Sequence, residues 1–306
     1  MREITVATVQ MKPALGEVED NLVKMTDFIS TIASQQKVDL IVFPELITSG
    51  NELGVRFTEM AQRIPGPSAN LIAQRAADYG VYIAFGMVMK ERVESVLYNT
   101  AVLVGPDGEL VGSYNKVHLH GEERMAFREG FRLPVFDTDI GQIGLMIGWD
   151  LAFPEVARAL TLDGAEVLCV LANWETSEMD EWRTYVKARA YENALYVVGA
   201  NRVGEDVTLS FGGESMIVGP RGKVYASLAG GDGAKPEEAG AEDEKTGDKL
   251  EEKGDKKDKK HPEPAPVREG YAVARIDLDE IRRHREAHQT LQTRQPTVYR
   301  ALVKKY

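Results

Sequence analysis

IGLMIGWDLAFPE, residues 143–155, is the stretch that says most about the fold of this chain. Its first half belongs to a short apolar run, Gln142 to Ile147, which predicts a buried strand. Pro154 predicts the start of a helix over residues 154–162, because proline is favoured in the first helical turn. Between them, Gly148 suits a strand-to-turn connection with unusual backbone dihedral angles. A strand, a turn and a helix in this order are typical of α/β domains.

The same alternation of strands and helices continues along most of the chain. Apolar runs predict strands at residues 4–9, 38–43, 81–87, 99–105, 110–114, 133–137, 142–147, 167–171, 195–200, 215–218, 224–226 and 271–276. Periodicity predicts helices at 68–79, 154–162, 179–194 and 279–288, and an earlier helix that Asp20 caps. Several strands form hairpins, so we expect an α/β domain with a mixed sheet. Two packed sheets with helices outside would accommodate this many strands.

Residues 228–270 differ from the rest of the chain. They contain no Phe, Trp or Tyr, and their only Leu, Ile or Val residues are Leu228, Leu250 and Val267. Such a segment cannot bury enough apolar surface to offset its loss of conformational entropy. We therefore predict one domain over residues 1–306, with a disordered, solvated insertion at 228–270 and a C-terminal tail from about residue 289. A partner-binding role for the insertion would rest on its composition alone.

Composition argues against several classes of function. The chain has 306 residues, 43% of them hydrophobic, and a formal net charge of −11. An acidic chain without a basic stripe does not favour nucleic-acid binding. No apolar run approaches the ~20 residues that span a membrane, and the N-terminus leads directly into a strand rather than a signal peptide. The single cysteine, Cys169, excludes an intramolecular disulfide, so we expect a cytoplasmic protein.

Three short motifs, taken in order, resemble those of the nitrilase superfamily, the carbon–nitrogen hydrolases. They are FPEL at residues 43–46, YNKVHL at 114–119 and GWD at 148–150. Similar landmarks follow at 171–174, 190–193, 199–202, 213–220 and 294–299, so the resemblance covers nearly the whole chain apart from the insertion. Each motif alone is weak, but their joint order and spacing are specific.

The resemblance implies a catalytic triad of glutamate, lysine and cysteine at strand ends. Glu45 would be the base that takes the thiol proton, because a thiol is a good nucleophile only as thiolate. Lys116 would stabilise the tetrahedral oxyanion, with the backbone N–H of Trp149 as a second donor. Glu123 is expected to support the lysine, with Glu122 as the alternative.

Position 148 departs from the family pattern. The residue before Trp-Asp or Tyr-Asp is the catalytic cysteine in the family, and it is glycine here. Without the thiol no acyl-enzyme can form, so the chain as it stands is predicted to be inactive. Two origins stay open: a Cys→Gly substitution, or a natural protein that binds an amide or carboxylate without turnover. Cys169 is no replacement, because it lies in the apolar run 167–171 and is expected to be a small buried hydrophobe.

The resemblance also implies a class of substrate. Asp150 follows Trp149 here, as in the amidase and carbamoylase branches, whereas a glutamate follows in many true nitrilases. This favours hydrolysis of a small amide to a carboxylic acid and ammonia. Hydrolysis of an N-carbamoyl amine or amino acid is the alternative, and nitrile hydrolysis is third. Trp149, Asn173 and Trp174 are expected to bind the substrate.

The fold implied by the resemblance is a four-layer α-β-β-α sandwich, with two mixed sheets inside and helices outside. Two copies would pair into an eight-layer homodimer or a higher homo-oligomer, with the stretch from about Arg294 reaching across to the partner copy. No organic cofactor is implied. A metal site is not expected either, because His118 and His120 lack a third histidine or cysteine at a familiar zinc spacing.

Overall fold

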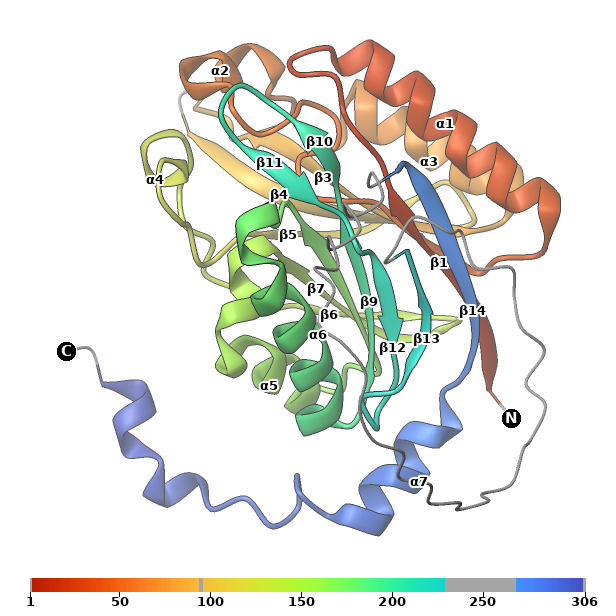
Figure 1. Ribbon diagram of the computed structural model, residues 1–306, viewed down its shortest axis with the longest axis vertical. Coiled ribbons are helices and arrows are strands. Elements are labelled where there is room, and N and C mark those ends of the chain that lie inside the picture. Colours follow the sequence, from red (N-terminus) through yellow and green to blue (C-terminus); the bar gives the residue numbers. More distant parts are fainter. Residues whose placement is uncertain (1, 94–95, 229–267, 305–306) are drawn as a thin grey trace, which may run out of the picture.

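The computed structural model describes residues 2–93, 96–228 and 268–304, and it contains two packed six-stranded mixed sheets (Figure 1). Sheet A has the order β14 (Gly270–Asp277), β1 (Glu3–Gln10), β2 (Leu40–Val42), β3 (Tyr82–Lys90), β4 (Leu97–Val104) and β5 (Leu110–Asn115). Sheet B has the order β13 (Val224–Ser227), β12 (Met216–Val218), β9 (Tyr196–Asn201), β8 (Val167–Ala172), β7 (Gly141–Ile147) and β6 (Val135–Thr138).

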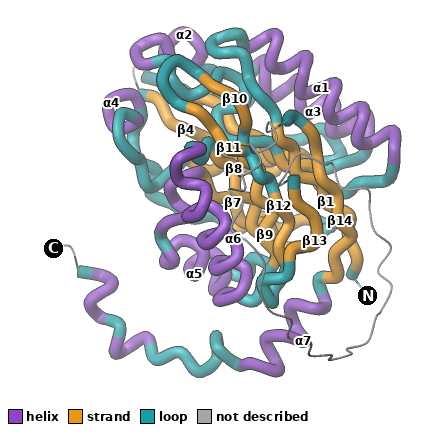
Figure 2. Tube along the Cα trace, in the orientation of Figure 1, coloured by secondary structure: helices purple, strands orange, loops and turns teal. Residues whose placement is uncertain are grey.

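Helices cover the outer faces of both sheets and complete four layers (Figure 2). Sheet A is covered by α1 (Val18–Gln35) and α3 (Pro67–Tyr79), and sheet B by α5 (Pro154–Leu162) and α6 (Met179–Asn193). α7 (Asp279–His288) follows β14. The short helical turns are α2 (Phe57–Met60), α4 (Glu123–Ala126), η1 (Gly54–Arg56), η2 (Gly148–Ala152), η3 (Thr176–Glu178), η4 (Pro296–Val298) and η5 (Arg300–Val303). The expected α-β-β-α sandwich is confirmed.

Successive side chains along a strand point to two different buried faces of the sheet. One face packs against the other sheet, and the other packs against the outer helices. In β1, Val6 packs in the core between the sheets, whereas Ala7 and Val9 pack against α1 and α3. In β8, Cys169 lies between the sheets and Val170 lies under the helices of sheet B, so the whole strand is buried. This is why such strands are continuous apolar runs in the sequence.

Three local predictions are wrong in detail. Asp20 does not cap α1, because the helix begins at Val18 and Asp20 lies in its first turn, where a carboxylate favours the helix dipole. The strand predicted at 38–43 is shorter and spans only β2. A two-stranded ribbon of β10 (Val203–Glu205) and β11 (Ser210–Gly212) is absent from the prediction, since each of these short strands contains a glycine and only one large apolar residue.

The predicted insertion at 228–270 lies almost entirely outside the described residues. At its borders, Leu228 is buried, and the backbone carbonyl of Arg268 accepts a 2.7 Å hydrogen bond from the side chain of Gln10. After α7, residues 289–304 extend away from the two sheets (Figure 1). Within the described ranges, no helix is long and apolar enough to cross a membrane.

Candidate active site

Four segments from both sheets meet around one cavity of about 560 Å³. Glu45 follows β2 and Lys116 follows β5 in sheet A. Gly148 follows β7 and Asn173 follows β8 in sheet B. All four residues line the cavity, so the structure brings together residues that are up to 128 positions apart. The site forms only where the two sheets pack against each other.

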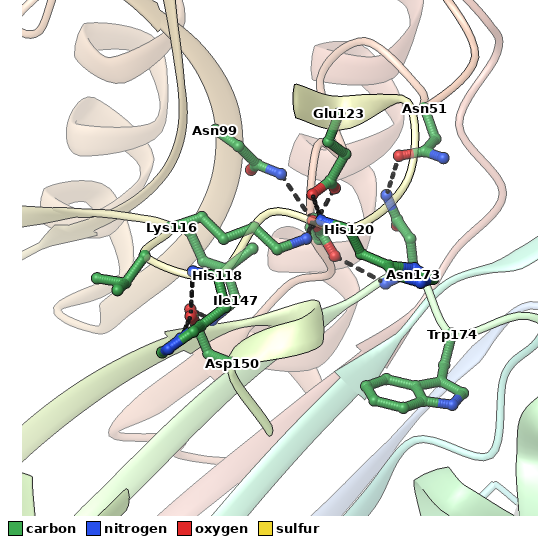
Figure 3. Close-up of polar contacts among 12 residues, drawn as sticks. Asn51, Asn99, Lys116, His118, His120, Glu123, Ile147, Asp150, Asn173 and Trp174 are labelled. Atoms are coloured by element: carbon green, nitrogen blue, oxygen red, sulfur yellow. Dashed lines mark hydrogen bonds and ion pairs between the residues drawn. The ribbon is translucent and has the colours of Figure 1, made fainter. Parts of the chain in front are cut away.

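Glu45 is almost fully buried, with 2% of its surface exposed. Its Oε1 accepts hydrogen bonds from Nδ2 of Asn99 (2.7 Å) and Nζ of Lys116 (2.8 Å), and its Oε2 accepts one from the backbone N–H of Asn173 (3.1 Å) (Figure 3). Burial raises the pKa of Glu45 to about 7, although the charge of Lys116 opposes this rise. A carboxyl group with this pKa can both accept and return a proton near neutral pH.

Lys116 lies between two carboxylates. Its Nζ donates to Glu45 and, at 2.7 Å, to Oε1 of Glu123 (Figure 3). Burial acts to lower the pKa of Lys116, but the charges of Glu123 and Glu45 outweigh burial and hold the pKa above its ordinary value. The ammonium group is therefore charged at neutral pH. Glu123, rather than the exposed Glu122, is the residue that contacts the lysine.

Gly148 lies beside both of these groups, at the start of η2. Its φ of +43° is in the left-handed region that favours glycine. A Cβ atom placed on Gly148 would overlap Oε2 of Glu45 and lie 3.0 Å from Nζ of Lys116. A side chain at position 148 would therefore contact both the carboxylate and the ammonium, provided that Glu45 shifts slightly to admit it.

Asp150 connects the turn at position 148 to the segment that carries Lys116. Its buried carboxylate accepts hydrogen bonds from the hydroxyl of Tyr114 (2.6 Å) and from the backbone N–H groups of Ile147 (3.1 Å) and His118 (3.0 Å). Burial and the charge of Asp150 raise the pKa of Tyr114, so this hydroxyl remains a neutral donor. The motif at 148–150 contains Asp150, but the sequence alone assigned it no role in positioning the site.

Two asparagines hold Glu45 from opposite sheets. Asn99, in β4, donates to its carboxylate, and the sequence carried no signal for this residue beyond its place in a strand. Asn173, in the orientation that satisfies its amide, donates to the backbone carbonyls of Glu45 (2.9 Å) and Ala172 (3.1 Å). The side chain of Asn173, which we expected to bind substrate, is thus engaged in positioning Glu45.

Aromatic rings form one wall of the cavity. Trp149 stacks on His120, with ring centroids 4.4 Å apart, and on Trp174, with centroids 5.9 Å apart. The indole N–H of Trp174 donates to the backbone carbonyl of Glu178 at 3.0 Å. The two tryptophans expected to bind substrate therefore line the cavity, although Trp174 is almost fully buried and packs on Trp182 and Tyr185.

Cys169 and His118 do not line the cavity, whereas His120 does. Cys169 is buried between the sheets, and burial raises the pKa of its thiol to about 12, which suppresses the reactive thiolate. His118 stacks on Phe153 and contacts Asp150, whereas His120 stacks on Trp149. The described part of the chain holds no group of three or more His, Cys, Asp or Glu residues that could bind a metal ion.

The sequence matches a known family and curated relatives. The Carbon-nitrogen hydrolase family model matches residues 5–233. The chain is 46% identical over 226 residues to a probable nitrilase of Schizosaccharomyces pombe, a match that covers 73% of this chain and 83% of the relative. It is 30% identical over 224 residues to the 2-oxoglutaramate amidase of Bacillus subtilis, which covers 72% of this chain and 85% of the relative.

Solved structures share the fold. Nit3 of Saccharomyces cerevisiae, a member of branch 10 of the nitrilase superfamily, matches with a TM-score of 0.77 and 22% identity over 96% of each chain. A double mutant of the amidase from Nesterenkonia sp. AN1, in complex with acrylamide, matches with a TM-score of 0.77 and 23% identity over 99% of this chain and 98% of that one. The chain belongs to the carbon–nitrogen hydrolase family of the nitrilase superfamily, as its motifs predict.

Proposed function

We propose that this chain carries the active-site framework of an amidase that cleaves small amides to a carboxylic acid and ammonia, with position 148 as the place of the nucleophile. The observation that supports this is the contact that any side chain at position 148 makes with both Glu45 and Lys116. Acyl transfer requires a nucleophile, a base and a positive charge for the oxyanion within contact distance of one another.

With cysteine at position 148, each group has a defined task. Glu45 accepts the thiol proton, and the thiolate attacks the amide carbon. Lys116 and the backbone N–H of Trp149 stabilise the resulting oxyanion. The tetrahedral intermediate collapses to a thioester, and Glu45 returns its proton to the departing ammonia. Glu45 then takes a proton from water as the water attacks the thioester, and returns it to the departing thiolate, which releases the carboxylic acid and restores the free thiol.

With glycine at position 148, no atom is available to form the thioester. We therefore expect the chain as it stands to bind an amide without turnover. Glu45, Lys116 and Glu123 keep their mutual contacts in this form, so the binding site for the amide group is retained.

The choice of an amide is supported by the names of some relatives, whereas the relative in Schizosaccharomyces pombe is named a probable nitrilase. The relative in Bacillus subtilis is described as a 2-oxoglutaramate amidase. A mutant of the Nesterenkonia sp. AN1 amidase carries the acetamide moiety of fluoroacetamide covalently at its active-site cysteine. Hydrolysis of an N-carbamoyl amine or amino acid is the alternative, because it uses the same triad and would release carbon dioxide together with ammonia.

Ammonia release from a panel of small amides and N-carbamoyl amino acids tests the proposal. Three forms are compared: the chain itself, Gly148→Cys and Gly148→Ala. The alanine form is the matched control, because it adds a Cβ atom at the same strained position but no thiol. We expect only the cysteine form to release ammonia, and its best substrate would identify the branch of the family.

Two outcomes would change this conclusion. Turnover by the glycine or alanine form would contradict the thioester mechanism. A folded Gly148→Cys form that turns over nothing on the panel would favour a non-catalytic ligand-binding protein instead.

A further inference from the structure

The cavity beside Gly148 is lined by an excess of carboxylates. Among the described residues that line it, Lys116 is the only lysine or arginine. Lys116 is already shared by two glutamates, and four more glutamates line the cavity without a cation of their own in its wall. The six glutamates are Glu45, Glu52, Glu122, Glu123, Glu175 and Glu178.

Glu52 is fixed as an anion by the loop between β10 and β11. Its Oε2 accepts hydrogen bonds from the backbone N–H groups of Val207 (2.8 Å), Thr208 (2.8 Å) and Leu209 (2.9 Å). Burial acts to raise the pKa of Glu52, but these hydrogen bonds hold the pKa below its ordinary value. The charge of Glu52 is therefore a permanent feature of the cavity wall at neutral pH.

Glu175 and Glu178 are carboxylates without partners. No hydrogen bond or ion pair engages either side chain in the parts of the chain that the structure describes, and both residues are half-buried. Burial raises the pKa of Glu175, the charges of Glu178 and Glu52 raise it further, and His120 opposes the rise. Two half-buried like charges that repel each other are stabilised when a cation binds between them.

The aromatic wall adds a second, independent feature that suits a cation. Trp149 lines the same cavity and is partly exposed, whereas Trp174, which directly precedes Glu175 in the chain, is buried against Trp182 and Tyr185. The faces of indole rings carry partial negative charge and attract ammonium groups. Carboxylates and tryptophan faces together are the surroundings in which alkylammonium groups bind favourably.

We infer that the cavity selects amides whose acyl portion carries a protonated amino group, and that Glu175 and Glu178 determine this preference. The inference rests on the proposed function for the position of the amide group at Glu45, Lys116 and residue 148. The volume of about 560 Å³ has room for a chain of several carbon atoms between the two ends of such a substrate. A substrate with a second carboxylate would meet repulsion from the same wall.

Binding to the chain as it stands is the direct test, because the glycine form does not consume its ligand. Titration calorimetry compares three probes of similar length: 4-aminobutanamide, pentanamide and glutaramate, which are cationic, neutral and anionic at neutral pH. We expect affinity in that order, with at least about a tenfold difference between the first and the last, as expected for a few weakly screened charge contacts. Raising the ionic strength from about 0.05 M to about 0.5 M should reduce this difference.

Charge-neutralising variants locate the preference in the cavity. Glu175→Gln and Glu178→Gln should each reduce the ratio of cationic to anionic affinity about threefold, which is the effect of one partly exposed charge. Glu286→Gln is the matched control, because it removes the same charge from an exposed position on α7 outside the cavity. This control should leave the ratio unchanged.

The outcomes separate the inference from the proposed function. Equal affinity for the three probes, or a preference for glutaramate, would overturn the inference, as would a control that lowers the ratio as much as the cavity variants do. If the chain prefers the cationic probe but Gly148→Cys shows no turnover, the inference about charge selectivity stands and the proposed amidase function fails. If Gly148→Cys turns over amides but binding shows no charge preference, the proposed amidase function stands and the inference about charge selectivity fails.

Discussion

In the proposed mechanism Glu45 exchanges protons near neutral pH, although only 2% of its surface is exposed. Its burial raises the pKa to about 7, while Lys116 and the amide of Asn99 limit the rise because they favour the ionised carboxylate. The pKa of Glu45 is therefore set by burial and the charge of Glu123, which raise it, and by two polar neighbours, Lys116 and Asn99, which lower it. Removing Lys116 or Asn99 should therefore raise the pKa of Glu45.

This balance predicts the pH dependence of the Gly148→Cys form. Below pH 7 Glu45 is protonated and cannot accept the thiol proton, so kcat/KM should rise with pH along a limb with a midpoint near 7. Asn99→Leu removes a hydrogen bond that favours the ionised form, so the pKa of Glu45 should increase and the limb should move to higher pH. Rates measured from pH 5 to pH 9 check this, and a limb that moves to lower pH in the Asn99 variant would contradict it.

At the residue scale, the sequence predicted the three central positions of the site better than the residues that hold them in place by hydrogen bonds. Glu45, Lys116 and position 148 each belong to a short motif that ends a strand, and the structure brings them into contact. Asn99 belongs to no motif, and its partner Glu45 lies 54 positions away, so only the folded chain reveals the contact. Asp150 was part of a motif, but its hydrogen-bond partners could not be known without the fold.

The ribbon of β10 and β11 is the element that closes the cavity wall beside Glu52. Its loop is held by Asp206, whose carboxylate pairs with Arg202 at 2.7 and 2.9 Å and whose side chain, like that of Arg202, is fully buried. The same carboxylate accepts hydrogen bonds from the backbone N–H groups of Asn51 (2.8 Å) and Glu52 (3.2 Å). The guanidinium group of Arg202 also lies over the ring of Phe211, 4.2 Å from its centroid. One buried ion pair therefore joins the ribbon to the segment after β2.

Asp206→Ala should be strongly destabilising, because it leaves the buried guanidinium of Arg202 without its counter-charge. Loss of one partner of a buried pair costs about 3–5 kcal/mol in the free energy of unfolding. Asp163→Ala, at an exposed position after α5, is the control and should change stability by less than about 0.5 kcal/mol. Urea denaturation of the three proteins measures the differences, and equal losses in both variants would show that the ion pair is not the cause.

At the element scale, the apolar content of a strand decided whether it could be predicted. The strands of sheets A and B that run for six or more residues carry a continuous or alternating apolar pattern, and each was placed to within a few residues. The strands β10 and β11 have no such pattern, because each contains only one large apolar residue, whereas the equally short β2 and β12 are apolar throughout. The small turns that surround the site were missed for the same reason.

The C-terminal tail supports a proposal about assembly. Residues 289–304 leave the body of the molecule, and Val298 and Leu302 are 72% and 63% exposed. We propose that this tail packs on a second copy of the chain in a homodimer, where these apolar side chains become buried. Light scattering should give twice the mass of one chain for the full protein and a lower dimer fraction after truncation at residue 289. A full chain that remains monomeric at high concentration would contradict the proposal.

Strand β1 pairs with β14 along its whole length, from Glu3 opposite Asp277 to Gln10 opposite Gly270. Strand β1 therefore receives this neighbour only when synthesis of the chain has reached β14. At roughly 5–20 residues per second, the interval lasts on the order of tens of seconds. Throughout it, one edge of β1 offers unpaired backbone groups to any other extended chain nearby. The order of synthesis, rather than the stability of the finished sheet, thus sets the period in which this edge of β1 is open to mispairing.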